Sequence, residues 1–258
     1  MQSSTTSVSI LDAMRFLLTM GADYAPRGMK TIETRNYQFN VDYPFSSFTD
    51  RKFDLNYLKK EFLWYLSSNP FNDAILDASK NWLKFRQPDG KWFSNYGQYW
   101  FGPHTRDCRS GFDWVFTQLR KDPDSRQAVI PMLQPTHLFD GNPDVVCTAY
   151  INFHIRNNKL HMTVRMRSSD IIWGYGNDLP CFWWLHEMMC VALDIEWGTY
   201  THSSDSLHVY ERHFEMIHNI VQKGMDEFYR IEYPPITNVN DLLDGNFVTP
   251  FGRWLMER

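Results

Sequence analysis

The sequence predicts an α+β fold, in which helices pack on a mostly antiparallel sheet. Apolar residues recur every three or four positions in the segments 10–18, 55–66 and 112–119, and this spacing is typical of amphipathic helices. Between residues 144 and 167 the apolar period changes to two, which is typical of strands buried on one face. Both kinds of element along one chain indicate the α+β class.

The segment 144–167 is predicted to be a hairpin, with a long helix after it. Asn157-Asn158 separates two alternating runs and suits a tight turn, and Cys147 is expected on the first strand. The long helix is expected to begin near Asp178, because Asp suits an N-cap and Pro180 would fall in the first turn.

No repeat, low-complexity tract or Pro/Gly/Ser linker interrupts the chain. With 43% hydrophobic residues, the 258 positions contain enough apolar side chains for a sizeable core. Residues 1–258 are therefore predicted to form a single domain.

Charge and cysteine content exclude several classes of protein. The net charge of −4 argues against a nucleic-acid partner, which would need a basic face. The four cysteines lack the spacing of a zinc site or a disulfide framework, so no metal and a reducing compartment are expected. Neither a signal peptide nor a membrane-spanning apolar run is expected. A cytoplasmic location follows as the expectation.

Seven local strings stand out along the chain. They are KTIE (30–33), EFLWYL (61–66), SNYG (94–97), DPDSRQAV (122–129), VVCTAYINFHI (145–155), MRSSDIIWGYGND (166–178) and SLHVYERHF (206–214). In their order and spacing, over about residues 27–214, these strings resemble the thymidylate synthase family, and the similarity is greatest to the phage deoxycytidylate hydroxymethylase branch. The resemblance implies a thymidylate-synthase-like α+β domain that modifies a pyrimidine nucleotide.

Cys147 stands at the nucleophile position of this family and is followed by Thr148, as in the hydroxymethylase branch. Taken alone, a strand cysteine is more often a packed core residue. The resemblance implies that its thiolate adds to carbon 6 of the base, because carbon 5 of a pyrimidine is too weakly nucleophilic until an enamine forms.

Arginines are implied to bind the nucleotide phosphate, since a guanidinium makes paired charge-assisted hydrogen bonds. Arg126 and Arg167 match family positions for this role, and Ser168 is expected to help. Arg126 is implied to reach into the site of a partner subunit, so a homodimer with shared active sites is expected. Gln127 stands where the family usually has a second arginine. Arg27, one place out of register, is a candidate to compensate.

Further positions match family residues with roles at the base, the sugar or the folate. His208 and Tyr210 are implied to form hydrogen bonds to the sugar hydroxyl, and they share one face of a strand. Glu61 lies on the apolar stripe of its helix, where burial would raise its pKa and suit proton relay, and Tyr96 is implied to order water near the nucleophile. As isolated residues, each also fits a structural role.

The resemblance implies 5,10-methylenetetrahydrofolate as the cosubstrate. Trp82, Asp170 and Gly174 match the family's folate-contacting region. On sequence grounds alone, Trp82 and Asp170 could equally be a core residue and a cap.

Asp178 stands where thymidylate synthases have the Asn that pairs with uracil. An ionised carboxylate offers only acceptors, which suits the exocyclic amine of cytosine and a proton at ring nitrogen 3. It would repel the carbonyl of uracil, so dCMP is the expected substrate.

The expected reaction is hydroxymethylation: a one-carbon unit passes from the folate to carbon 5 of dCMP, water adds, and tetrahydrofolate leaves. Three alternatives stay open at this point. One is a hydroxymethylase acting on the ribonucleotide CMP, and another is a methylating thymidylate synthase acting on dUMP. The third is a relative that binds a nucleotide or RNA without catalysis, although Cys147 and the acidic charge argue against it.

Overall fold

The computed structural model describes residues 6–41, 44–45, 50–51, 54–224 and 231–257. Residue contacts divide the chain into two compact units. The first unit comprises residues 1–53, 163–183 and 199–232, and the second comprises residues 54–162, 184–198 and 233–258. The prediction of a single domain stays a prediction.

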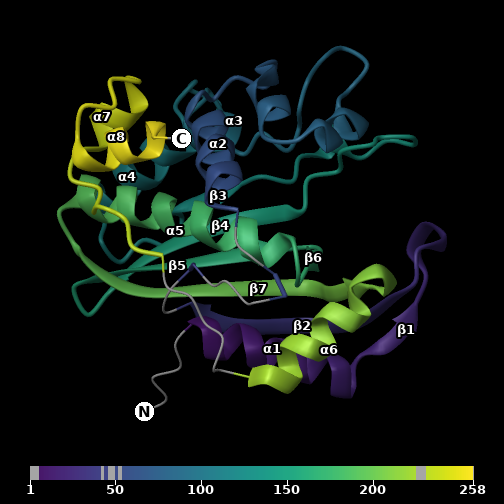
Figure 1. The fold of residues 1–258 in the computed structure, drawn as a ribbon. Coiled ribbons are helices and arrows are strands. Elements are labelled where there is room, and N and C mark those ends of the chain that lie inside the picture. Colours follow the sequence, from purple (N-terminus) through teal and green to yellow (C-terminus); the bar gives the residue numbers. More distant parts are fainter. Residues whose placement is uncertain (1–5, 42–43, 46–49, 52–53, 225–230, 258) are drawn as a thin grey trace. The chain divides into compact units, whose positions relative to one another are not determined.

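A seven-stranded sheet has the order β1-β2-β7-β5-β4-β3, and β6 pairs with β7 (Figure 1). Its strands are β1 Ala22–Tyr24, β2 Thr31–Val41, β3 Val129–Pro131, β4 Thr148–Arg156, β5 Lys159–Met166, β6 Ser169–Asp170 and β7 Glu196–Tyr210. The pairs β1–β2, β2–β7 and β3–β4 are antiparallel, whereas β6–β7 is parallel. The α+β class with a mostly antiparallel sheet is therefore confirmed.

In the first unit, α1 (Thr6–Met20) packs against β2 and against α6 (Phe214–Lys223), as Figure 1 shows. Leu11, Met14 and Leu17 recur at helical spacing and are fully buried. The helix predicted over residues 10–18 is confirmed. The 3-10 turns η1 (Pro26–Gly28) and η5 (Glu211–His213) flank the ends of β2 and β7 in this unit.

The second unit contains the other two predicted helices, α2 (Leu55–Leu66) and α4 (Gly111–Lys121). Each begins at a side-chain cap: Asp54 accepts from the Tyr57 amide and Ser110 from the Asp113 amide. The remaining helical elements are η2 Asp73–Asp77, η3 Lys80–Phe85, α3 Gly97–Trp100, η4 Pro135–His137, α7 Val239–Leu243 and α8 Pro250–Met256.

The hairpin prediction is confirmed. Asn157 and Asn158 have φ values of 53° and 58°, and they join β4 to β5. Positive φ at both central residues is the requirement of the two-residue turn whose twist matches antiparallel strands. Cys147, however, lies one residue before β4 rather than on it, because the regular strand begins only at Thr148.

The start predicted for the long helix is wrong. α5 runs from Gly174 to Leu193, so Asp178 lies inside the helix and Pro180 does too. The entry to this helix is instead held by Asp170, whose Oδ1 accepts the amides of Ile172 at 2.8 Å and Trp173 at 3.4 Å. Pro180 has no N–H, so it cannot make the usual bond to the residue four positions earlier.

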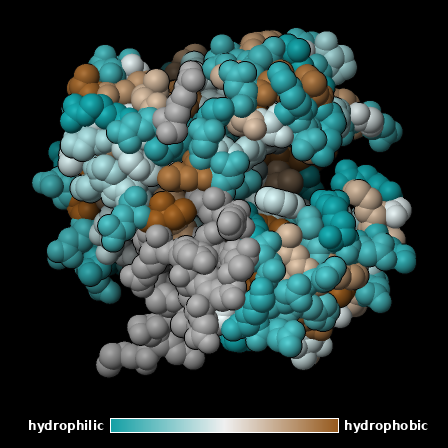
Figure 2. All heavy atoms as spheres, in the orientation of Figure 1, coloured by the Kyte–Doolittle hydropathy of each residue, from teal (hydrophilic) through white to brown (hydrophobic). Residues whose placement is uncertain are grey.

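No helix in the described ranges is both long and apolar enough to cross a bilayer. On the face shown in Figure 2, apolar residues are scattered among polar ones. Isolated apolar residues of this kind are normal on protein surfaces.

Candidate active site

Two carboxylates and a glycine meet in the first unit where α5 begins. A Cβ built on Gly174 would lie 3.5 Å from Oδ2 of Asp178 and 3.8 Å from Cβ of Asp170. Asp178 as a whole residue is half-buried. Burial, followed by the charge of Asp170, raises the pKa of Asp178 to about 7. The helix thus presents a carboxyl group that exchanges a proton near neutral pH.

Arg51, which was not among the predicted residues, lies beside these carboxylates. Its side chain is buried, and burial lowers its pKa to about 10 while Asp170 acts in the opposite direction. Its guanidinium carbon lies 5.4 Å from the ring centre of Trp173, and it fills the space where Gly176 lacks a side chain. A Cβ on Gly176 would overlap the guanidinium. The second glycine of GYG was the available signal, but it does not reveal which residue fills the space.

The predicted sugar-binding residues lie on β7 next to β6. Asp170 is in register with His208, and the Ile171 amide donates to the His208 carbonyl at 2.9 Å. His208 is buried, and burial lowers its pKa; nearby Asp170 opposes this shift, whereas Arg167 adds to it. The His208 and Tyr210 rings lie 5.0 Å apart. Asp170, His208, Arg167 and Tyr210 therefore belong to one neighbourhood.

The other predicted residues of the first unit differ in how exposed they are. Ser168 is half-buried beside Arg167, in the short gap between β5 and β6. Arg27 is exposed on η1 in the left-handed conformation, with φ 54° and ψ 31°. Sequence reasoning also missed His213, whose Nε2 accepts from Nε1 of Trp173 at 2.9 Å. Both residues lie within the family strings, but the strings do not reveal that the two side chains form a pair.

In the second unit, α2 joins two predicted residues through one hydroxyl. Glu61 is only 5% exposed, which confirms its expected burial. The Tyr57 hydroxyl donates to Oε1 of Glu61 at 3.2 Å and accepts from Nε1 of Trp82 at 3.0 Å. Tyr57 was not predicted, although it lies one helical turn before Glu61. Glu61, predicted to relay protons, and Trp82, predicted to contact the folate, are therefore linked by hydrogen bonds through the Tyr57 hydroxyl.

Tyr96 is buried against the same helix. Its ring stacks on Tyr65, with centroids 5.3 Å apart and planes 16° apart. Gly97 permits this approach, because a Cβ there would overlap the carbonyl oxygen of Tyr65. Ser94, at the start of the SNYG string, donates through its amide and its hydroxyl to Asp144. This contact anchors the SNYG string to the loop that leads to half-buried Cys147.

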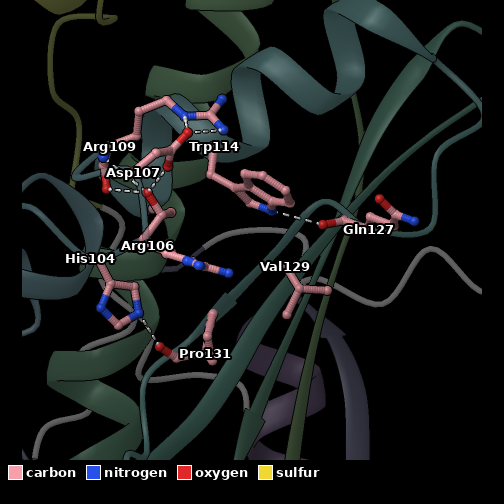
Figure 3. A pocket seen from close by; sticks show the side chains of 10 residues that line it. His104, Arg106, Asp107, Arg109, Trp114, Gln127, Val129 and Pro131 are labelled. Atoms are coloured by element: carbon pink, nitrogen blue, oxygen red, sulfur yellow. Dashed lines mark hydrogen bonds and ion pairs between the residues drawn. The ribbon is translucent and has the colours of Figure 1, made fainter.

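Arg126 and Gln127 are exposed on the loop before β3. Gln127 helps line a cavity of about 760 Å³, together with His104, Arg106, Trp114 and Val129. In Figure 3, Arg106 extends toward Val129, and the indole nitrogen of Trp114 donates to the Gln127 carbonyl at 3.0 Å. The lining of this cavity includes none of the predicted site residues.

The structure therefore groups most of the predicted residues within each unit. In the first unit it brings together Gly174, Asp170, Asp178, Arg167, Ser168, His208 and Tyr210. In the second unit it links Glu61 to Trp82 and seats Tyr96 on the same helix. Arg27 and Arg126 stand exposed on loops. Among the described residues, no cluster of three His, Cys, Asp or Glu could hold a metal ion.

A family model described as thymidylate synthase matches residues 9–248. The chain therefore belongs to the thymidylate synthase family, whose members are one-carbon transferases that use methylenetetrahydrofolate and a nucleotide. The suspected resemblance is confirmed.

Two curated relatives carry hydroxymethyltransferase names. Deoxycytidylate 5-hydroxymethyltransferase of Enterobacteria phage T4 is 29% identical over 222 residues, which cover 80% of this chain and 86% of that protein. Deoxyuridylate hydroxymethyltransferase of Bacillus phage SP01 is 30% identical over 259 aligned positions, covering 92% of this chain and 66% of that protein. The thermostable thymidylate synthase A of Bacillus subtilis has the same fold: its TM-score is 0.75 at 20% identity, with 93% and 92% of the two chains covered.

Proposed function

We propose that the protein transfers a one-carbon unit from 5,10-methylenetetrahydrofolate to carbon 5 of dCMP and adds water, giving 5-hydroxymethyl-dCMP and tetrahydrofolate. The main support is the carboxyl group of Asp178, half-buried beside Asp170 with a pKa raised to about 7. The relatedness to the phage T4 enzyme supports the same substrate.

Asp178 can pair with cytosine through two hydrogen bonds that share one proton. One carboxyl oxygen accepts from the exocyclic amine, while a proton lies between the other oxygen and ring nitrogen 3. A carboxyl group that titrates near neutral pH suits such a shared proton, because either partner can hold it. Fully ionised Asp178 would instead face the carbonyl oxygen of uracil without a proton between them.

Cys147 is proposed to add through its sulfur to carbon 6, so that carbon 5 becomes an enamine carbon and attacks the methylene group. Carbon 5 then loses its proton as tetrahydrofolate departs, which leaves an exocyclic methylene. Water adds to this methylene, and the sulfur leaves. Glu61, bonded to the Tyr57 hydroxyl, is proposed to relay these protons. Tyr96 is proposed to order the water.

The remaining predicted residues are proposed to bind substrates. Arg126, Arg167, Ser168 and Arg27 are assigned to the phosphate, with Arg126 supplied by the partner in a homodimer. His208 and Tyr210 are assigned to the sugar, and Trp82, Asp170 and Gly174 to the folate. The cytoplasmic location stays a prediction.

Product analysis tests the proposal. The purified protein is incubated with methylenetetrahydrofolate and, separately, with dCMP, CMP and dUMP, while dihydrofolate absorbance is followed. Hydroxymethylated dCMP without dihydrofolate is the expected result. Methylated dUMP with dihydrofolate would show a thymidylate synthase instead, and a product from CMP alone would move the substrate to ribonucleotides.

Hydroxymethylation of dUMP is the second candidate, and the same carboxyl group favours it. When protonated, Asp178 offers a donor for the uracil carbonyl and an acceptor for its ring N–H. The phage SP01 relative is named for deoxyuridylate. In the same experiment, a hydroxymethylated dUMP product without dihydrofolate would identify this activity.

A further inference from the structure

A row of side chains continues past the predicted sugar-binding residues to an arginine with no assigned role. His208, Tyr210 and Arg212 follow one another at intervals of two where β7 passes into η5. The His208 and Tyr210 rings lie 5.0 Å apart, and the guanidinium carbon of Arg212 lies 4.4 Å from the centre of the Tyr210 ring. Stacking of this kind orients a guanidinium and leaves its N–H groups available at the edge.

The charge of Arg212 is not neutralised within the described part of the chain, where it forms no ion pair. Its neighbour Glu211 forms an ion pair with Lys30 at 3.1 Å. Glu211 and Lys30 line a separate cavity of about 480 Å³ that does not include Arg212. The carboxylate nearest in sequence is therefore occupied elsewhere.

Other arginines lie at the same end of the sheet. Thr31 pairs with Tyr210, and the Glu211 amide donates to the Lys30 carbonyl at 3.0 Å, so the turn that carries Arg27 joins this end of β7. Arg167 is close enough to His208 to lower its pKa. The surroundings of His208 thus include the cation of Arg167 together with the carboxylates of Asp170 and Glu33.

We propose that Arg212 binds the phosphate of the nucleotide and supplies the cation that Gln127 does not. This inference rests on the proposed function, which assigns the sugar to His208 and Tyr210. A nucleotide whose sugar meets these two residues has its phosphate within reach of a neighbouring side chain. Arg212 offers the fixed fork that suits a phosphate dianion, and it is exposed enough to meet one.

The test measures binding and turnover of dCMP by Arg212→Gln. In calorimetry without folate, the variant is expected to bind dCMP about tenfold more weakly than the wild type. The inhibition constant of inorganic phosphate, measured in competition with dCMP, should rise by a similar factor. KM for dCMP should rise by about tenfold, while kcat changes by less than about twofold. Arg212→Lys, which keeps the charge and loses the fork, should fall between the variant and the wild type.

Lys30→Gln is the matched control, because it removes one positive charge from the same end of the sheet. It should leave the binding of dCMP and phosphate unchanged. If Lys30→Gln and Arg212→Gln weaken dCMP binding equally, the effect is one of overall charge, and the proposal is overturned. Unchanged competition by inorganic phosphate in Arg212→Gln would overturn it as well. Binding is measured without folate, so it does not depend on turnover. A wild type that binds dCMP through Arg212 but forms no hydroxymethyl product would contradict the proposed function and leave the role of Arg212 supported.

Discussion

Replacing Asp178 with Asn is expected to stabilise the fold, and the gain should grow as the pH rises from 5 to 8. Burial and the charge of Asp170 raise the pKa of Asp178 from its ordinary 3.8 to about 7. The folded state therefore holds this proton more tightly than the unfolded state does. The stability that Asp178 contributes is full below about pH 4 and is lost as the pH rises through about 7. Asn has no charge to bury at any of these values.

The size of the effect follows from the shift. A rise of about three pKa units corresponds to at most about 4 kcal/mol of stability lost on ionisation. Asp178 keeps partial contact with solvent, which screens its charge, so about half of that value is expected at pH 8. Between pH 5 and pH 8 the advantage of the Asn variant should therefore grow by about 1 kcal/mol.

Urea unfolding of both proteins at pH 5 and pH 8 measures this difference directly. Asp140→Asn, which removes an exposed carboxylate, serves as the control and should show no growth with pH. A gain that is equal at the two pH values, or a loss at pH 8, would refute the reasoning. The wild type would then be holding Asp178 ionised without cost.

Three further predictions concern other contacts. The kcat/KM for dCMP should fall as the pH passes upward through 7, because ionised Asp178 no longer holds the proton that lies between its carboxyl group and ring nitrogen 3 of cytosine; steady-state kinetics at pH 6 and 8 check this. Tyr57→Phe removes the hydroxyl between Glu61 and Trp82, so kcat should fall by about tenfold in a turnover assay. Gly97→Ala places a methyl group against the Tyr65 carbonyl, so urea unfolding should show a loss of about 3 kcal/mol.

Each of these has a control within the chain. A kcat/KM for dCMP that stays constant from pH 6 to pH 8 would contradict the proton shared between Asp178 and cytosine. Tyr150→Phe, on an exposed tyrosine, should keep full turnover, and equal loss in both tyrosine variants would argue against the relay. Gly174→Ala would make only ordinary contacts at 3.5 Å or more, so its stability should change little; a similar loss there would point to backbone strain rather than overlap.

Local patterns predicted the elements whose signals are local. The hairpin followed from Asn157-Asn158, because few residues tolerate positive φ at two successive positions. The burial of Glu61 followed from its position on the apolar stripe of α2. The family strings predicted the thymidylate-synthase-like fold.

Contacts between distant segments could not be predicted in this way. The start of α5 was misplaced because Asp178 and Pro180 looked like an N-terminus, whereas Asp170 caps the entry from outside the helix. Arg51 was missed because its role depends on the space beside Gly176, more than a hundred positions later in the chain. Such pairs have no periodic signature.

The contacts of the buried Lys59 ammonium constrain the order in which parts of the second unit can fold. This ammonium donates a hydrogen bond to the backbone carbonyl of Trp254, 195 positions later, and its nitrogen lies 4.1 Å from the centre of the Trp254 ring. A ribosome makes α2 long before it makes α8, so on the nascent chain this lysine has none of these partners. Helix α2, which also carries Glu61, can reach its final packing only after Trp254 has left the exit tunnel. The packing of α2 against α8 is therefore one of the last contacts to form as this unit folds.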